Sequence, residues 1–432
     1  MSIGHRTITR RRAFGLVGAL ALLTAAACAS EPKPPPNPTT PPGPTDPDGA
    51  TMQTAANDPA ASAYQAGATG FALSMLSAAI GSGSENAVIS PLSISQCISL
   101  VGQGANGATL TQIAETFGCA DADELRSGAN AEITAIAALT DAKFDMANTT
   151  CTDESFEVKA NFAKAATDWF GVAPHTTDFA DPDKATSTIN AWVSERTNDK
   201  IPKLLAPGQV TTDTRTVLVN ALYLKALWAS QFNPDKSSDR PFTLSDGSTV
   251  QAKFMQDHRD VRVTQQGGAT LIELPYEDDD LTALFYLPTG GTSLADAAAA
   301  LAPSSLEELV AKLDETDAKI YIPTFEVRQR LEVKDALKEL GILDAFDPDK
   351  ADFSALAYEP TYVAFVQHEA WLKVGEKGTE GAAATAAGIE ASAAPGDEPL
   401  ELLLDRPFLF AVRVRSTGSV AFVAAVQDPS QK

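Results

Sequence analysis

Residues 376–406 read EKGTEGAAATAAGIEASAAPGDEPLELLLDR, and this stretch decides the fold. It separates a strand-like run at residues 362–374 from a second strand-like run that begins after Pro407. A structureless connection of this length is unusual in a compact domain and is typically functional or disordered. Its first half holds mostly Ala, Gly and Thr, so a flexible loop and an exposed Ala-rich helix both fit the composition.

The alternation of residues in this first half favours a third interpretation, a loop that can become a strand. Counting from Thr379, one face carries only small or apolar residues: Thr379, Gly381, Ala383, Thr385, Ala387 and Ile389. Both acidic residues, Glu380 and Glu390, fall on the opposite face. Because successive strand side chains point to opposite faces, the segment is suited to enter the middle of a sheet.

Helical and strand-like patterns divide the rest of the chain unevenly. Helical periodicity predicts helices at residues 63–80, 92–102, 110–117, 161–169, 183–197, 305–313 and 333–340. Strand-like runs lie at residues 269–275, 281–287, 319–323 and 362–374, and residues 408–414 and 419–426 form a hairpin. Helices dominate the first half and strands the second, which indicates a mixed α+β fold without internal repeats.

The 432-residue chain carries a formal net charge of −23. Such a surface repels phosphate backbones, so nucleic acid is not an expected partner. The spacing of the cysteines and histidines indicates no metal site, and no cofactor is expected. An enzyme is not expected either, because the sequence has no Gly-x-Ser-x-Gly elbow, His-Glu-x-x-His pair or phosphate-binding glycine loop.

Residues 1–28 are predicted to be a signal peptide. Basic residues and Phe14 precede an apolar run, residues 15–27, that is too short for a permanent transmembrane helix. The RRAF motif resembles a twin-arginine export signal, with a plain Sec signal as the alternative. The small residues before Cys28 resemble a bacterial lipobox, although Ala25 stands at its usual leucine position. We expect export and a lipid anchor on Cys28 at the outer face of the cell membrane, with free secretion as the alternative.

Residues 29–57 are predicted to be a linker. The proline density of residues 31–48 favours an extended polyproline II conformation, which makes a semi-rigid stalk. Residues 58–432 remain for the folded domain. Among its cysteines, Cys97 is expected to be buried in a helix, and a disulfide between Cys119 and Cys151 is left open.

Several blocks in this domain, taken in order, resemble the serpin family over residues 58–428. The blocks are residues 86–94 (NAVISPLSI), 104–109 (GANGAT), 218–228 (LVNALYLKALW), 274–276 (LPY), 287–288 (LP), 340–342 (LGI), 351–354 (ADFS), 376–385 (EKGTEGAAAT) and 405–410 (DRPFLF). Each block alone is weak evidence, but their shared order makes the resemblance specific.

The resemblance implies a serpin fold of three β-sheets and about nine helices, with an exposed reactive-centre loop. It implies a suicide inhibitor of serine proteases, with cysteine proteases as a second class of target. The protease attacks the loop and forms an acyl-enzyme, and the cut loop then inserts into the largest sheet. A non-inhibitory serpin that acts as a binding or scaffold module is the main alternative, and a solute-binding lipoprotein is a third. Proteins of this family are usually monomers.

The same resemblance assigns roles to individual residues. The hinge of the loop comprises Glu376, Gly378, Thr379, Glu380, Gly381, Ala382, Ala383, Ala384 and Thr385. A polar cluster beneath the opening strands, the shutter, comprises Ser90, Ser93, Asn220 and His368, and the insertion entrance, the breach, holds Trp228. By residue type alone, His368 and Trp228 are equally well explained as core residues.

The loop spacing usual in the family, counted from Glu376, places the cleaved bond at Ser392–Ala393, with Ala391–Ser392 as the runner-up. Small side chains surround this bond and no basic residue does, so elastase-like or subtilisin-like proteases are the expected targets. Cleavage after Glu390 by a glutamate-specific protease is a minor alternative.

Three positions depart from the family pattern. Thr324 stands where many relatives carry a lysine that pairs with the hinge glutamate, so Glu376 is expected to lack that partner. Gly375 replaces a polar residue, and Gly381 replaces an alanine. These departures put the efficiency of inhibition in question more than its mechanism.

Overall fold

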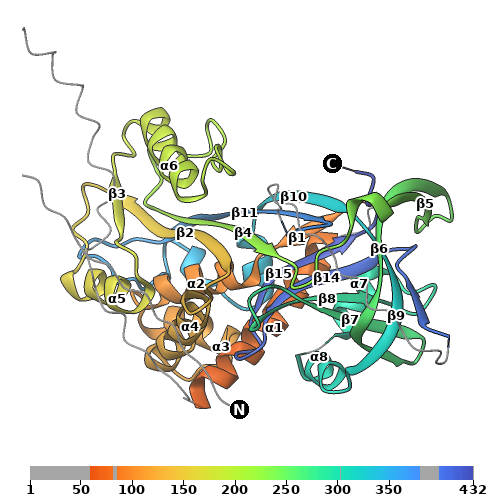
Figure 1. The fold of residues 1–432 in the computed structure, drawn as a ribbon. Helices are drawn as coiled ribbons and strands as arrows, with labels where there is room; N and C mark the ends of the chain where they lie inside the picture. Colours follow the sequence, from red (N-terminus) through yellow and green to blue (C-terminus); the bar gives the residue numbers. More distant parts are fainter. Residues whose placement is uncertain (1–58, 81–84, 302, 380–397, 432) are drawn as a thin grey trace, which may run out of the picture. The chain divides into compact units, whose positions relative to one another are not determined.

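The computed structural model describes residues 59–80, 85–301, 303–379 and 398–431 (Figure 1). The predicted signal peptide, Cys28 and the linker lie outside the described residues. The hinge beyond Thr379 and the predicted cleavage site at residues 391–393 lie outside them as well.

Nine α-helices form within the described ranges, six of them before residue 200. They are α1 (Pro59–Ile80), α2 (Pro91–Gly102), α3 (Gly107–Thr116), α4 (Ala122–Ala137), α5 (Ala160–Phe170), α6 (Pro182–Arg196), α7 (Leu294–Ala300), α8 (Pro303–Val310) and α9 (Lys334–Glu339). Polar N-caps fix the starts of several of these helices, because their side chains accept hydrogen bonds from backbone N–H groups of the first turn. Ser90 caps α2, Asp121 caps α4 and Asp181 caps α6.

The strands concentrate in the second half of the chain, as predicted. They are β1 (Ala87–Ile89), β2 (Ala142–Asp153), β3 (His175–Thr177), β4 (Thr216–Leu227), β5 (Ser238–Thr243), β6 (Thr249–Gln266), β7 (Ala269–Pro275), β8 (Leu281–Leu287), β9 (Asp314–Pro323), β10 (Phe325–Glu332), β11 (Val363–Gly375), β12 (Gly378–Thr379), β13 (Leu400–Leu403), β14 (Phe408–Val414) and β15 (Val420–Val426). The predicted mixed α+β class is therefore confirmed.

These strands connect into two hydrogen-bonded sheets, where the resemblance implied three. One sheet has the order β10-β11-β12-β4-β2-β3, and the other has the order β1-β15-β14-β8-β7-β6-β9-β13 with β5 paired to β6. The difference arises from the 18-residue strand β6, which pairs with β7 at one end and with β5 and β9 further along. Two groups of strands that could count as separate sheets thus share one continuous strand.

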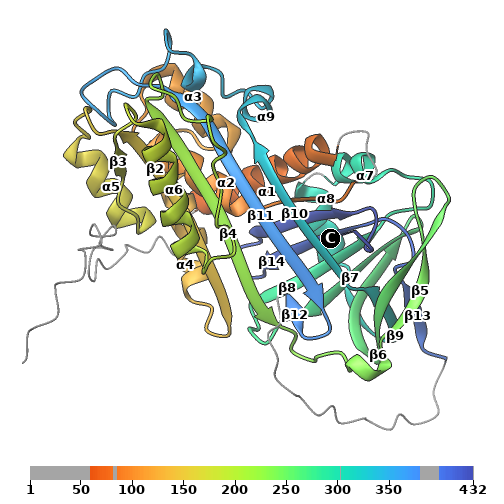
Figure 2. The same ribbon diagram turned by 90° about the horizontal axis from the view of Figure 1, so that it is seen from above.

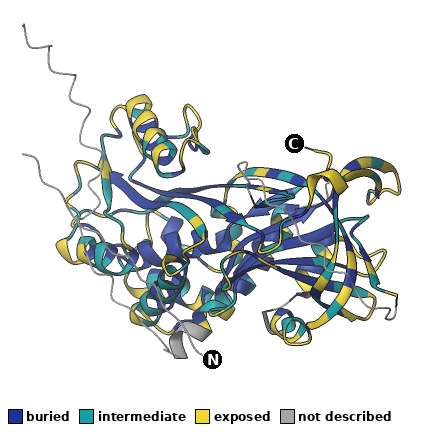
Figure 3. Cartoon of the chain, viewed as in Figure 1, coloured by how far each residue is buried: buried dark blue, intermediate teal, exposed yellow. Residues whose placement is uncertain are grey.

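The six-stranded sheet is covered on both faces (Figure 1). Helix α6 lies over one face, where Ile189 and Val193 pack with Val217 and Val219 of β4. The helices α1 to α5 lie on the opposite side (Figure 1). Nine consecutive residues of β4 are buried, as expected for a central strand covered on both faces (Figure 3).

Cys97, Cys119 and Cys151 are all buried and free. The disulfide left open between Cys119 and Cys151 is therefore not formed. Within the ranges described above, no helix combines the length and the apolar character needed to cross a membrane.

Candidate functional site: the seam between β4 and β11

The strands β4 and β11 lie side by side and parallel, but they pair along only part of their length (Figure 2). Their register runs from Thr216 opposite Val363 to Leu222 opposite Ala370. At the far end the two residues of β12 take the place between them, with Thr379 opposite both Val374 of β11 and Ala226 of β4. We call this boundary the seam. The root of the long loop thus already lies in the seam as a short strand.

Gly378 enters the seam in a conformation that other residues rarely adopt. Its φ is +146°, and a Cβ atom at this position would lie 2.1 Å from the carbonyl oxygen of Ala226. Both restrictions exclude a side chain, because φ > 0 and a close backbone approach favour glycine. The hinge therefore depends on glycine at this position for entry into the sheet.

Thr379 follows as the first side chain to enter the seam, and it is buried. Its Oγ1 lies 2.5 Å from the hydroxyl oxygen of Tyr276, and burial raises the pKa of that tyrosine above its usual value. The Tyr276 ring stacks on Trp228 with 4.5 Å between the centroids and 10° between the planes. The threonine hydroxyl thus makes a polar contact in a pocket that is otherwise lined by aromatic rings.

Trp228, the predicted breach residue, is buried beside the turn that leads into β12. Its Nε1 donates to the carbonyl oxygen of Gly375 at 2.9 Å, and its backbone N–H donates to the carbonyl oxygen of Lys377 at 2.9 Å. The tryptophan therefore holds both ends of the tight turn between β11 and β12. A Cβ on Gly375 would meet no atom within 4 Å, so this departure from the family pattern has no steric cause.

Glu376 has a lysine partner, which corrects the expectation drawn from Thr324. Nζ of Lys253, on β6, lies 2.5 Å from Oε1 of Glu376, and Oγ of Ser237 donates to the same oxygen at 3.0 Å. Partial burial alone would raise the pKa of Glu376, but the hydrogen bonds from Lys253 and Ser237 outweigh it and lower the pKa. The backbone N–H of Thr324 donates to the carbonyl oxygen of Lys253, so the lysine lies next to the position where it was expected.

The shutter residues lie together beneath the seam, in one row across three strands. His368 on β11 is opposite Asn220 on β4, and Asn220 is opposite Asn148 on β2. Nδ1 of His368 hydrogen-bonds Oδ1 of Asn220, and Nδ2 of Asn220 donates to Oδ1 of Asn148 at 3.0 Å. The row is therefore a continuous chain of hydrogen bonds that crosses the seam.

The N-terminal end of α2 adds hydrogen bonds to both ends of this row. The backbone N–H of Ser90 donates to Nε2 of His368 at 3.1 Å, and Oγ of Ser93 donates to Oδ1 of Asn148 at 3.1 Å. Because Nε2 accepts a hydrogen bond, His368 is neutral with its proton on Nδ1. Burial lowers the pKa of His368 to about 3, which agrees with a neutral ring.

Sequence reasoning gave no site role to Tyr276 or Ser237, and it missed two further residues of this site, Asn148 and Lys253. Asn148 lies in a polar stretch, ANTT, that gave no strand signal, and Lys253 lies on a strand with weak alternation. Their roles depend on pairing between strands that are distant in sequence, β2 with β4 and β6 with β9. A prediction of those pairings would have been the signal that found them.

Together these features define a class of protein in which a sheet covered by helices holds the root of a long loop between two parallel strands. Residues 66–429 match the serpin family, described as Serpin (serine protease inhibitor). The chain belongs to the serpin family. It is therefore a member of a family of protease inhibitors and not an enzyme.

Individual relatives agree with this assignment. Serpin-Z2B of Triticum aestivum is 31% identical over 376 residues, which cover 82% of this chain and 94% of that protein. The leukocyte elastase inhibitor of Xenopus laevis is 31% identical over 355 residues, which cover 80% and 93%. Among solved structures, the thermophilic serpin tengpin in its native state is similar with a TM-score of 0.77 and 25% identity, covering 84% of this chain and 94% of that one.

Proposed function

We propose that this chain is a single-use inhibitor of serine proteases that traps its target by inserting residues 379–389 into the seam. The observation that carries the proposal is the position of β12, whose two residues lie between β4 and β11. The strand that must enter after cleavage would continue β12 through the same boundary. The uncharged face of its residues fits the buried side of the sheet.

The covalent step is ordinary serine-protease chemistry that stops at the acyl-enzyme ester. The protease serine oxygen attacks the carbonyl carbon of Ser392, the bond to the nitrogen of Ala393 breaks, and the amine of Ala393 leaves with the proton taken from the serine. The product is an ester between the protease and Ser392. Insertion of the cut loop carries the protease away before water hydrolyses this ester, and a displacement of about 1 Å in its active site can slow hydrolysis about 100-fold.

Insertion is favourable because the new central strand forms backbone hydrogen bonds along both of its edges. Each ladder hydrogen bond contributes about 1 kcal/mol net, and burial of the inner face adds to this. About ten such bonds match the whole stability of a typical domain. The uncut state is then metastable, and cleavage releases the stored free energy.

Elastase-like or subtilisin-like proteases fit the loop best as targets. The residues around Ser392–Ala393 are mostly small, and a shallow specificity pocket accepts such side chains. The Xenopus relative named as a leukocyte elastase inhibitor supports the same class of target. We further propose that a lipid on Cys28 holds a monomeric inhibitor at the outer face of the cell membrane, with residues 29–57 as the stalk.

The test is to incubate the full chain with pancreatic-type elastase, subtilisin and trypsin and to separate the products on a denaturing gel. We expect a complex with elastase or subtilisin that survives boiling, and mass spectrometry should place the cut after Ser392. Each protease with its serine blocked beforehand is the matched control and should give no complex. Clean cleavage without a complex would overturn the proposal and favour a non-inhibitory binding module.

A further inference from the structure

The rows of the seam continue without a slip from the paired part of β4 and β11 to β12. The last paired residues of the two strands are Leu222 opposite Ala370. Counted onward at the same step, Ala226 falls level with Val374, and these are the two residues that lie opposite Thr379. A strand that continues β12 into the seam therefore keeps one register with both of its neighbours.

This register assigns a row to each loop residue of an inserted strand. Because β12 is antiparallel to β4 and β11, each step forward along the loop is one step back along both strands. Glu380 would fall in the row of Lys225 on β4 and Lys373 on β11. Glu390 would fall in the row of Arg215, the residue directly before β4. The two acids are ten residues apart in the sequence, and so are Lys225 and Arg215.

The two acids would lie on the outer face of the sheet, which is the face that α6 covers. Thr379 contacts Tyr276 in the buried cluster on the opposite face, so strand alternation turns Glu380 outwards. Glu390 follows at an even spacing and lies on the same face. The residues between them on this face are Ala382, Ala384, Ala386 and Gly388. The outer face of the inserted strand would thus carry charge only at its two ends.

The basic residues of these rows share the outer face. The residues on either side of Lys225 and of Lys373 belong to the buried inner cluster, so both lysine side chains point outwards. Arg215 lies two residues before Val217, which packs beneath α6, and so it is on the outer face as well. Acids and bases would therefore meet on the same side of the sheet.

At the β12 end of the seam, the positive charges exceed their partners. Lys225 is directly opposite Lys143 of β2, and like charges in opposite positions destabilise a sheet. Lys143 pairs with Asp145 at 2.9 Å, and Lys373 pairs with Glu326 at 3.0 Å. Among the described residues no carboxylate pairs with Lys225. A carboxylate placed between Lys225 and Lys373 would supply the missing negative charge.

At the other end of β4, Arg215 also has no ion pair within the described part of the chain. Its Nη1 donates to the carbonyl oxygens of Thr212 and Thr214, both at 3.0 Å. The acidic residues that line the same surface cavity are Asp153, Glu154 and Asp178. None of them reaches Arg215, so its hydrogen bonds to neutral carbonyls leave the charge without a counter-ion.

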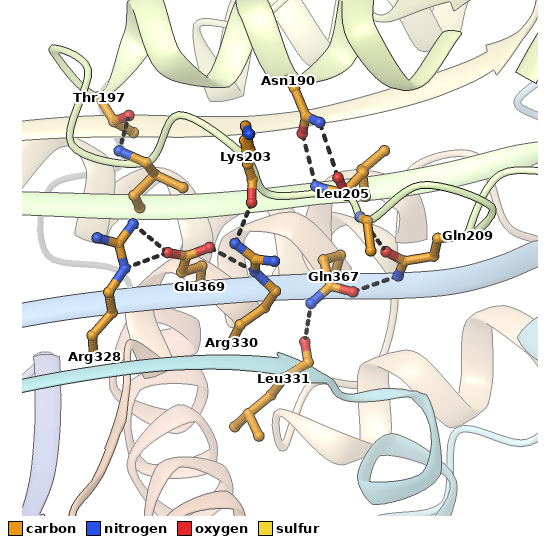
Figure 4. A network of polar contacts seen from close by, with 12 residues as sticks. Asn190, Thr197, Lys203, Leu205, Gln209, Arg328, Arg330, Leu331, Gln367 and Glu369 are labelled. Atoms are coloured by element: carbon orange, nitrogen blue, oxygen red, sulfur yellow. Dashed lines mark hydrogen bonds and ion pairs between the residues drawn. The ribbon is translucent and has the colours of Figure 1, made fainter. Parts of the chain in front are cut away.

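Between the two ends, the charge on the outer face of β11 is already neutralised. Glu369 is buried, and its two carboxylate oxygens accept from Nε of Arg328 at 2.7 Å and from Nε of Arg330 at 2.9 Å (Figure 4). The loop residue in the row of Glu369 would be Ala384, which brings no charge beside this cluster. The loop therefore offers an acid where a base lacks a partner and a neutral residue where the charges are paired.

We propose that Lys225 and Lys373 receive Glu380, that Arg215 receives Glu390, and that these contacts fix the register of the inserted loop. We call them the register pairs. A slip of two residues keeps every side chain on its own face, so the alternation of the loop alone does not exclude it. The small residues between the acids fit any row. Two acids at the ends of the strand leave one register in which both meet a base.

This inference rests on the proposed inhibitory function and deepens it. Ser392, which would carry the protease as an ester, follows Glu390 by two residues. The register of the strand therefore sets how far along the sheet the protease is carried. Lys225, Lys373 and Arg215 are positioning residues for the inhibitory reaction, because they act on the loop and not on the protease.

The test is a set of double-mutant cycles in the full chain after its loop has been cut by subtilisin. Glu380, Glu390, Lys225 and Arg215 are each replaced by glutamine, singly and in acid–base pairs. Thermal unfolding in a fixed concentration of urea, which does not screen charges, gives the unfolding equilibrium constant of each variant. For the matched pairs, Glu380 with Lys225 and Glu390 with Arg215, we expect a coupling of about threefold in this constant, as for an exposed ion pair.

The same four substitutions supply the matched control. The crossed pairs, Glu380 with Arg215 and Glu390 with Lys225, would lie about 33 Å apart at about 3.3 Å per residue, so their effects should be additive. The uncut protein should show no coupling between Glu390 and Arg215, since β12 holds the loop root at the opposite end of β4. Coupling that is equal in matched and crossed pairs, or absent from the matched pairs, would overturn the proposal.

Two outcomes separate the register pairs from the proposed function. If the wild type forms no covalent complex while the matched pairs still couple in the cut protein, the inhibitory function falls and the register pairs remain. If complexes form but all four pairs are additive, the register pairs fall alone. Should a glutamine variant fail to fold, Arg215→Glu is combined with Glu390→Arg. The exchanged pair should regain the stability that the cut form of Arg215→Glu loses, and a failure to regain it would count against the pair.

Discussion

The hydroxyl oxygen of Tyr276 lies 2.5 Å from Oγ1 of Thr379, inside the sheet and beside the stacked ring of Trp228. In the proposed mechanism this contact marks the first step of insertion, because Thr379 is the first loop side chain between β4 and β11. The pocket is buried and offers Thr379 one polar partner there, so its size and polarity select a small hydroxyl residue.

Replacing Thr379 by arginine should convert the inhibitor into a substrate. The seam would have to bury an unpaired charge, which costs several kcal/mol. We expect elastase to cut the loop of Thr379→Arg without forming a complex that survives a denaturing gel. Thr379→Ser keeps the hydroxyl and should still form the complex; complex formation by Thr379→Arg would contradict insertion through this pocket.

Removing the lysine partner of Glu376 should loosen the hinge more than it destabilises the protein. The Lys253 side chain is half exposed, so Lys253→Gln should lower the free energy of unfolding by less than about 1 kcal/mol. Amide exchange at Gly378 and Thr379 should nevertheless rise, since Glu376 anchors the turn that feeds β12. Lys350→Gln, which breaks an exposed pair with Asp347, should leave this exchange unchanged. Equal exchange in both variants would show that the ion pair does not hold the hinge.

Local sequence patterns correctly predicted the strands whose bounds depend only on their own residues. The strands β7, β8 and β14 have the predicted bounds, because each is an apolar run closed by turn residues. Helix α4 was missed, since its sequence ADELRSGANAEITAIA interrupts the apolar pattern with Gly128. That glycine has a tertiary cause: a Cβ there would lie 2.3 Å from Cβ of Tyr64 on α1.

The family resemblance named Glu376, Gly378, Thr379, Trp228 and the shutter residues, all of which lie at or beneath the seam, but it could not supply their partners. Lys253 and Asn148 act through strand neighbours far away in sequence, and a single sequence does not state those pairings. The error about Thr324 has the same origin. A lysine was sought at position 324, between β9 and β10, whereas the charge comes from Lys253 on the neighbouring strand β6 and reaches the same carboxylate.

Truncating Asn148 should weaken the shutter. Asn148→Ala leaves the Asn220 amide and the Ser93 hydroxyl without their acceptor in a buried site. Such a loss costs about 1–3 kcal/mol, to be measured as a fall in the free energy of unfolding. Asn106→Ala removes an exposed hydrogen bond to Ser354 and should cost less than about 0.5 kcal/mol. Similar losses in the two variants would argue against a central role for Asn148.

The shutter histidine should make stability depend on pH. The folded pKa of His368 is about 3, below the value of 6.5 expected when unfolded, so its contribution is present above pH 6.5 and is lost as the pH falls towards 3. Between pH 6.5 and 5 the loss is about 2 kcal/mol. Glu132 acts in the opposite direction, because burial raises its pKa to about 7 and its contribution is lost as the pH rises.

The histidine effect is isolated by comparing the wild type with His368→Gln, since Glu132 is common to both. Glutamine does not titrate, so the difference in unfolding free energy between the two proteins should shrink by about 2 kcal/mol from pH 6.5 to pH 5. Denaturant unfolding at the two pH values measures this difference. A difference that stays constant would mean that His368 is not held neutral by the shutter.

The central claim, that the seam between β4 and β11 receives the loop, is tested most directly by a crystal structure of the protein after its loop has been cut. Our account predicts that residues 379–389 form a strand between β4 and β11, so that His368 and Asn220 are no longer opposite neighbours. A cut protein in which His368 still lies opposite Asn220, with the loop outside the sheet, would contradict the account.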